Sequence, residues 1–155
     1  MASESNIVDF DLTANEFGLY DIALDSDGDI SSVQSFDTAI LMSLFEEKRA
    51  DSSEVAITQN RRGYWGNEFY QDVADREQGS KIWLYEQARL NQDTINGIDD
   101  ATNDCLLWLV EQQFIKSIDI NVNSQRGVVV GNVSLVRFNS QTESKSFILW
   151  ENTGK

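Results

Sequence analysis

The sequence has no histidine, no proline and a single cysteine, and the first and last of these each narrow the possible chemistry. Without histidine, the chain lacks the side chain that most often acts as a general base or binds zinc near neutral pH. One cysteine cannot form an internal disulfide. Cys105 lies in an apolar segment, so we predict a buried thiol with a structural role. We expect no cofactor and no metal.

Positive charge is also scarce, because 12 lysines and arginines oppose 26 acids, for a net charge of −14. Nucleic acids and anionic membranes bind basic surfaces, so we expect neither as a partner. Eleven acids and no base precede Lys48, whereas seven of the 12 bases lie between Lys48 and Arg89. An acidic front and a more basic middle can pair within the chain or with neighbouring subunits.

The length of 155 residues and the hydrophobic fraction of 41% are those of one globular domain. We predict a single α+β domain over residues 1–155, with an antiparallel β-sheet and about three helices in its middle. Residues 1–36 are expected to form short strands, residues 37–115 the helical middle, and residues 116–151 a C-terminal β-meander.

Hydrophobic periodicity and capping residues give the expected elements. An Asp-Gly turn is predicted at residues 25–29, and a β-bulge at Gly131-Asn132. The predicted helices are residues 37–50, capped by Asp37, residues 80–90, capped by Ser80, and residues 91–114, capped by Asn91 or Asp93. The predicted strands are residues 7–12, 19–24, 118–122, 128–138 and 147–150.

The segment Arg61–Gly66 places two arginines, two aromatic rings and two glycines side by side. Arginine suits carboxylates, and Tyr64 and Trp65 combine apolar area with a polar atom. One interpretation is a packed corner in which Arg61 and Arg62 pair with acids of the same chain. The other is a surface that docks against another protein together with Trp83.

The last predicted strand is apolar and consists of Phe147, Ile148, Leu149 and Trp150. At the end of a meander, such a strand can form a sheet edge to which a strand of another protein is added. The alternative is a strand inside the sheet, because periodicity does not order the strands.

Three motifs in succession resemble the baseplate wedge proteins of Mu-like contractile-tailed phages. They are Thr38–Phe45 with Lys48-Arg49-Ala50, then Arg61–Gly66, then Gly79–Leu84, and the run Leu106–Glu111 resembles the last helix of the same family. The resemblance covers roughly residues 20–120. The wider class of lysozyme-like baseplate and sheath-initiator proteins often has a Glu-Pro-Arg signature, which a chain without proline lacks.

The resemblance implies a structural protein of the virion tail baseplate, assembled in the host cytoplasm and present in several copies around the tail axis. It implies that the chain joins wedge to tube and initiates sheath polymerisation. The implied partners are other wedge proteins, the tail sheath protein, and tube or hub proteins. Partner-binding residues are expected at Arg61, Arg62, Tyr64, Trp65, Trp83, Phe147, Ile148, Leu149 and Trp150.

Two other classes of function remain open from the residues alone. A peptidoglycan hydrolase needs two carboxyl groups about 5–10 Å apart, one of them with a raised pKa. The chain has many acids, but no motif singles out a pair, so we expect no enzyme. An acidic assembly chaperone that leaves before the particle matures is the other alternative.

Overall fold

The computed structural model describes residues 9–14, 20–33, 35–69 and 77–151. The chain divides into two compact units, Met1–Met42 and Ser43–Lys155. The division lies within helix α1, which spans Asp37–Phe45.

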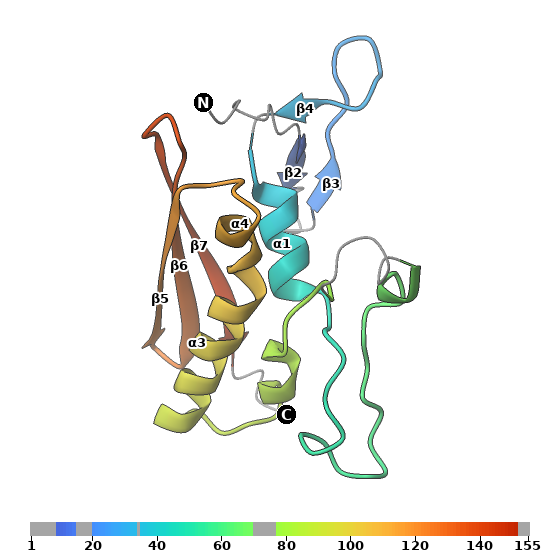
Figure 1. Ribbon diagram of the computed structural model, residues 1–155, viewed down its shortest axis with the longest axis vertical. Coiled ribbons are helices and arrows are strands. Elements are labelled where there is room, and N and C mark those ends of the chain that lie inside the picture. The colour runs from blue at the N-terminus through green and yellow to red at the C-terminus, as the bar shows by residue number, and fades with distance from the viewer. Residues whose placement is uncertain (1–8, 15–19, 34, 70–76, 152–155) are drawn as a thin grey trace. The chain divides into compact units, whose positions relative to one another are not determined.

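The first unit contains two short antiparallel ribbons (Figure 1). Strand β1 (Asp9–Phe10) pairs with β4 (Ser32–Val33), and β2 (Leu12–Ala14) pairs with β3 (Tyr20–Ile22). The predicted strands 7–12 and 19–24 are therefore present in part, and residues 7, 8 and 19 lie outside the described residues.

The predicted Asp-Gly turn is confirmed between β3 and β4. The carboxylate of Asp25 accepts hydrogen bonds from the backbone N–H groups of Asp27 and Asp29. Gly28 has a φ of +84°, a conformation that glycine adopts without steric cost.

Helix α1 is shorter than the predicted helix over residues 37–50. It ends at Phe45 because the chain that follows is held in an extended form beside Ser80. The N–H of Ser80 donates to the carbonyl of Glu46, and the N–H of Lys48 donates to the carbonyl of Ser80. Asp37 is the first helical residue rather than the cap, and its N–H donates to Ser35 Oγ at 3.3 Å.

The predicted helix over residues 80–90 is a single 3-10 turn, η1, at Ile82–Tyr85. Ser80 is buried, and its hydroxyl donates to the carbonyl of Leu44 at 2.6 Å while accepting from the N–H of Ile82 at 3.3 Å. Its backbone groups are occupied by the bridge to Glu46 and Lys48, so the hydroxyl ties η1 to the end of α1 and does not start a longer helix.

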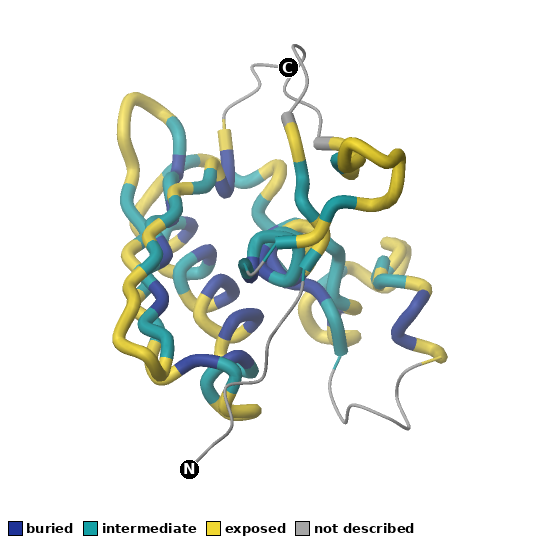
Figure 2. Tube along the Cα trace, turned by 90° about the horizontal axis from the view of Figure 1, so that it is seen from above, coloured by how far each residue is buried: buried dark blue, intermediate teal, exposed yellow. Residues whose placement is uncertain are grey.

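Helix α3 spans Gln92–Leu106, and the predicted cap is confirmed because Asn91 accepts from the N–H of Thr94. Its buried residues recur along one side (Figure 2). Cys105 is among them, as predicted, and burial raises the pKa of its thiol to about 12.

The predicted helix over residues 91–114 is interrupted at Leu107, and a short helix, α4, follows at Trp108–Glu111. Trp108 Nε1 donates to Ser43 Oγ, and its ring lies edge-on against Phe114. These contacts hold Trp108 in place at the start of α4. Gln113, with a φ of +59°, ends the helical segment.

The C-terminal meander consists of β5 (Ser117–Gln125), β6 (Val128–Val136) and β7 (Thr142–Glu151), in the order β5-β6-β7. Arg126 and Gly127 join β5 to β6 in a two-residue turn, both with positive φ, as a type I′ turn requires. Buried and less buried residues alternate along β6. Helix α3 packs on β5 and β6 (Figure 1).

The sheet has a bulge, but its position differs from the predicted one at Gly131-Asn132. Val129 pairs with Trp150 and Val130 pairs with Ile148, so Leu149 is the extra residue and lies on β7. Gly131 makes room for it, because a Cβ there would come within 2.6 Å of Leu149 Cδ1.

The predicted α+β class is confirmed, with helices in the middle of the chain and an antiparallel meander at its C-terminal end. In the part of the chain that the structure describes, no helix is both long and apolar enough to cross a membrane.

Candidate functional site

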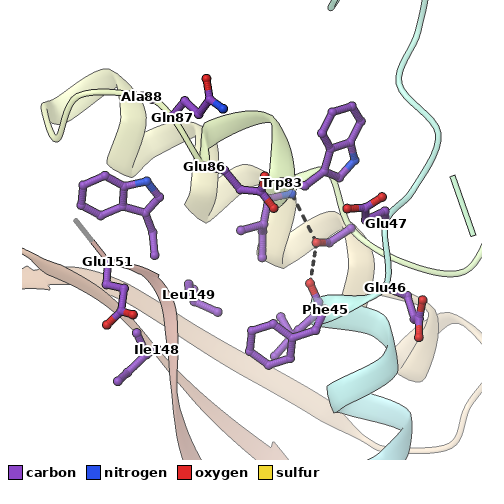
Figure 3. Close-up of a pocket in the computed structure, with 14 residues that line it drawn as sticks. Phe45, Glu46, Glu47, Trp83, Glu86, Gln87, Ala88, Ile148, Leu149 and Glu151 are labelled. Carbon is purple, nitrogen blue, oxygen red and sulfur yellow. Dashed lines mark hydrogen bonds between the residues drawn. The ribbon is translucent and has the colours of Figure 1, made fainter. Parts of the chain in front are cut away.

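A groove of about 1050 Å³ lies in the second unit between three elements (Figure 3). One wall is the end of α1 with the two glutamates that follow it, the second is η1 and the residues after it, and the third is the end of β7. The lining residues are Leu44, Phe45, Glu46, Glu47, Ser80, Ile82, Trp83, Glu86, Gln87, Ala88, Ile148, Leu149, Trp150 and Glu151.

The wall formed by β7 is an edge of the three-stranded sheet, because β7 pairs with β6 on one side only among the described strands. Four consecutive residues, 148–151, line the groove. Because of the bulge at Leu149, Leu149 and Trp150 are both buried, whereas Ile148 and Glu151 are exposed, so the groove borders both the inner and the outer side of this edge. The predicted position of this strand at a sheet edge is thus confirmed, and the alternative of an internal strand is wrong.

This stretch of β7 is anchored on one face and exposed on the other. Trp150 is buried, and its Nε1 donates to the carbonyl of Tyr85 at 2.8 Å. Phe147 lies edge-on to Phe45 with ring centroids 6.4 Å apart. Ile148, by contrast, is 58% exposed. The strand therefore presents a fixed edge with one uncovered apolar side chain.

The groove is acidic. Among the described residues that line it, four are glutamates and none is lysine or arginine. Glu47 and Glu86 are bound by Arg62, at 2.6 Å and 3.1 Å. Glu46 and Glu151 make no ion pair with any residue in the described ranges. Figure 3 places Glu151 on β7 and Glu46 beyond the end of α1.

Arg62 holds the rim of the groove together. Its guanidinium lies 4.7 Å from the centroid of the Trp83 ring, a cation–π contact. The hydrogen bond to Glu86, and then that to Glu47, raises the pKa of Arg62. Trp83 Nε1 donates to the carbonyl of Lys48 at 2.8 Å, which fixes the ring under the guanidinium.

The rest of the arginine-aromatic segment lies apart from the groove lining. Arg61 Nε donates to the carbonyl of Ala50, and the N–H of Ala50 donates to the carbonyl of Arg61. Trp65 is 72% exposed, between the ring of Tyr64 at 5.6 Å and the ring of Phe69 at 5.9 Å. Gly66 leaves room for the Tyr64 ring, because a Cβ at this position would clash with it.

The structure separates seven of the nine predicted partner-binding residues into two groups, whereas Arg61 bonds to Ala50 and Phe147 packs against Phe45 outside both. Trp83 and the strand residues Ile148, Leu149 and Trp150 line the groove, with Arg62 at its rim. Tyr64 and Trp65 form an exposed aromatic surface with Phe69. The predicted pairing with acids of the same chain is observed for Arg62. Arg61 instead bonds to the backbone carbonyl of Ala50.

Sequence reasoning missed the acidic lining of the groove. The helix predicted over residues 37–50 would include Glu46 and Glu47, but they lie beyond the end of α1 and line the groove. The signal available in the sequence was the excess of acids itself, which does not show which of them converge. Among the described residues, no group of three or more acids or cysteines is placed to hold a metal ion.

The family profile of phage protein GP46 matches residues 36–142, more than half of the chain. The chain belongs to this family. The baseplate protein gp46 of Escherichia phage Mu is 30% identical over 105 residues, 66% of this chain and 69% of that protein. The gp46 protein of the Mu-like prophage FluMu of Haemophilus influenzae is 25% identical over 114 residues, 73% of this chain and 76% of that protein.

The resemblance to Mu-like phage baseplate proteins is therefore confirmed, and with it the expected location in the tail baseplate of the virion. The chain is a structural component of that baseplate. The match ends at residue 142, where β7 begins, so most of the strand that lines the groove lies beyond it.

Proposed function

We propose that the chain joins the baseplate wedge to the tail tube and initiates sheath polymerisation by presenting β7 as a template for a strand of the sheath protein. The observation that supports this proposal is the edge of β7. Its inner face is held by Trp150 and Phe147, and a groove borders its outer side. The protein acts through shape and hydrogen bonding, and it makes or breaks no bond in a substrate.

Strand addition explains why an edge suits this task. The backbone N–H and C=O groups on the outer side of an edge strand are ready to pair with another extended chain. Each added pair forms the same ladder that joins β6 to β7. Because Trp150 and Phe147 fix the inner face of β7, an incoming strand meets a preformed partner and orders only itself.

The aromatic surface of Trp65 is the second proposed contact, with a neighbouring wedge protein as its partner. A tryptophan that is 72% exposed leaves a large apolar area in water. Aromatic residues are enriched among those that dominate the binding energy of interfaces. The tube or hub proteins complete the proposed set of partners.

A hydrolase finds no specific support in the site. In the groove, Arg62 brings together the carboxylates of Glu47 and Glu86 and binds both. A hydrolytic pair needs one carboxyl group that can give up a proton to a leaving group. The guanidinium occupies these oxygens, and the pair serves to hold the rim of the groove.

The proposal is tested by assembling baseplates with an Ile148→Lys variant and scoring the fraction that carry sheath in electron micrographs. Lysine on an edge strand opposes the addition of another strand. The matched control is Asn121→Lys, the same charge on an exposed residue of the opposite edge strand β5.

We expect Ile148→Lys to leave baseplates complete but with at least tenfold fewer sheaths, and Asn121→Lys to behave as the unmodified chain. Normal sheath assembly with Ile148→Lys would contradict the template role. Equal loss with both variants would show a general effect of added charge.

A further inference from the structure

We infer that the groove beside β7 selects a basic partner: the strand that it accepts carries lysine or arginine beside an apolar residue. This inference rests on the proposed template function and specifies the chemistry of the segment that β7 receives. It concerns a wall of the groove that lies mostly beyond the family match.

Charge complementarity is the first ground. Two carboxylates of the groove, Glu46 and Glu151, have no cationic partner among the described residues, and they lie on different walls (Figure 3). Glu47 and Glu86 share a single guanidinium, that of Arg62. The whole chain adds a net charge of −14, so its field attracts a basic segment and repels an acidic one.

The shape of the groove is the second ground. Four residues of β7 border it, a length of about 13 Å, which matches about four residues of an extended chain. Alternate side chains of such a chain point to the same face. One residue can then cover the exposed Ile148 while a neighbour on the same strand brings its cation to Glu151 or Glu46.

A second copy of this chain, with its β7 paired in parallel, does not fit the same groove. Its own β7 would bring another Glu151 to an edge where Glu46, Glu86 and Glu151 already stand. Like charges placed opposite one another across a strand pair destabilise it. Paired antiparallel, β7 would also bring Lys145, but with Glu143 and Glu151 it carries more acids than bases, so the occupant is a strand of a different protein with net positive charge.

Photocrosslinking in finished tails identifies the occupant. The probe is p-benzoylphenylalanine in place of Gln87, an exposed residue of the groove, with the same probe in place of Gln125 on β5 as the control. We expect position 87, and not position 125, to capture one peptide of a neighbouring protein, with lysine or arginine within two residues of the crosslink.

A captured peptide without a basic residue would overturn this inference and leave the template role intact. Capture of no neighbouring protein at position 87 would overturn both. The two failures are therefore distinguishable.

Charge reversal gives an independent readout. Glu46→Lys and Glu151→Lys should each reduce the rate of sheath initiation roughly threefold to tenfold, and rising salt should narrow the difference from the unmodified chain. The control is Glu111→Lys, an exposed residue of α4 outside the groove. Melting temperatures of the three variants show whether each still folds. Folded Glu46→Lys and Glu151→Lys variants that initiate sheath at the unmodified rate would overturn the inference.

Discussion

The sheet has two edges, and they differ in what they offer to another chain. On β5, one face carries a row of polar residues that bond to one another along the strand: Asn123 donates to Asn121 at 3.0 Å, and Gln125 donates to Asn123 at 3.1 Å. On β7, the exposed residues beside the groove are Ile148, which is apolar, and Glu151. Polar and charged side chains discourage strand addition at an edge, so we propose that β5 is the protected edge and that β7 is receptive at Ile148.

We propose that an edge strand needs support as well as exposure to act as a template. β7 is exposed at Ile148 but held by Trp150, whose indole bonds to the carbonyl of Tyr85. The bulge at Leu149 places two consecutive residues, Leu149 and Trp150, in the interior, while Ile148 stays exposed. The predictions below separate the supporting residues from the exposed ones.

The largest effect is expected when the support of β7 is removed. Trp150→Ala should lower the free energy of unfolding by about 3–5 kcal/mol, because it empties a buried aromatic site and leaves the carbonyl of Tyr85 without its donor. Ile148→Ala, two residues earlier, should change it by less than about 0.5 kcal/mol. Urea denaturation measures both. Similar losses for the two variants would contradict the division between supporting and exposed residues.

For the same reason, truncation of β7 does not test the template role. Removing Leu149 and Trp150 takes two buried residues out of the second unit. Substitutions confined to the exposed residue keep the strand in place.

The bulge should be next in effect. Gly131→Ala introduces a Cβ that would come within 2.6 Å of Leu149 Cδ1, so the leucine must move within a packed interior. We expect a loss of about 1–3 kcal/mol. The control is Gly127→Ala in the β5–β6 turn, where no atom lies within 4 Å of the added Cβ and the cost arises from the positive φ alone. The double variant Gly131→Ala/Leu149→Ala lacks the close contact, so its loss in free energy of unfolding should be smaller than the sum of the two single losses. A loss equal to that sum would show that the contact is not the cause.

Arg62 and Trp65 should separate stability from assembly. Arg62→Ala removes two part-exposed ion pairs and the contact with Trp83, for a loss of about 1 kcal/mol. A double-mutant cycle with Glu86→Gln measures the coupling between the two residues.

Trp65→Ala should leave the melting temperature unchanged and reduce the incorporation of the chain into baseplates. Unchanged incorporation would refute the docking role of the aromatic surface.

The smallest effect concerns Cys105, in helix α3, which packs on β5 and β6. Its thiol has a pKa of about 12 in the fold against an ordinary 9.0. Burial of the neutral thiol therefore stabilises the fold fully below pH 9, and this contribution is lost as the pH rises towards 12. We expect no labelling by a thiol reagent at pH 8 until the chain unfolds. Rapid labelling of the folded chain would show that α3 separates from the sheet and exposes Cys105.

Local patterns predicted those features of the fold that depend on neighbouring residues. Periodicity gave the meander and the long helix, and the side chain of Asn91 gave the start of that helix. Burial of Cys105 followed from the apolar run around it. In each case, the residues that decide the structure lie within a few positions of one another.

Contacts between distant residues decided the rest. Helix α1 ends at Phe45 because of the bridge between Glu47 and Ser80, 33 positions along the chain. The rim of the groove depends on Arg62, which meets Glu47 and Glu86 across 15 and 24 positions. No local pattern reports such pairs, so the acidic groove was not predicted, although the strand that borders it was.

Imaging of an assembled tail at a resolution that traces strands is the most direct test of the template role. We expect an additional strand from a sheath subunit paired with β7 along residues 148–151, and none beside β5. A tail in which β7 ends in solvent, or in which the added strand pairs with β5, would contradict it.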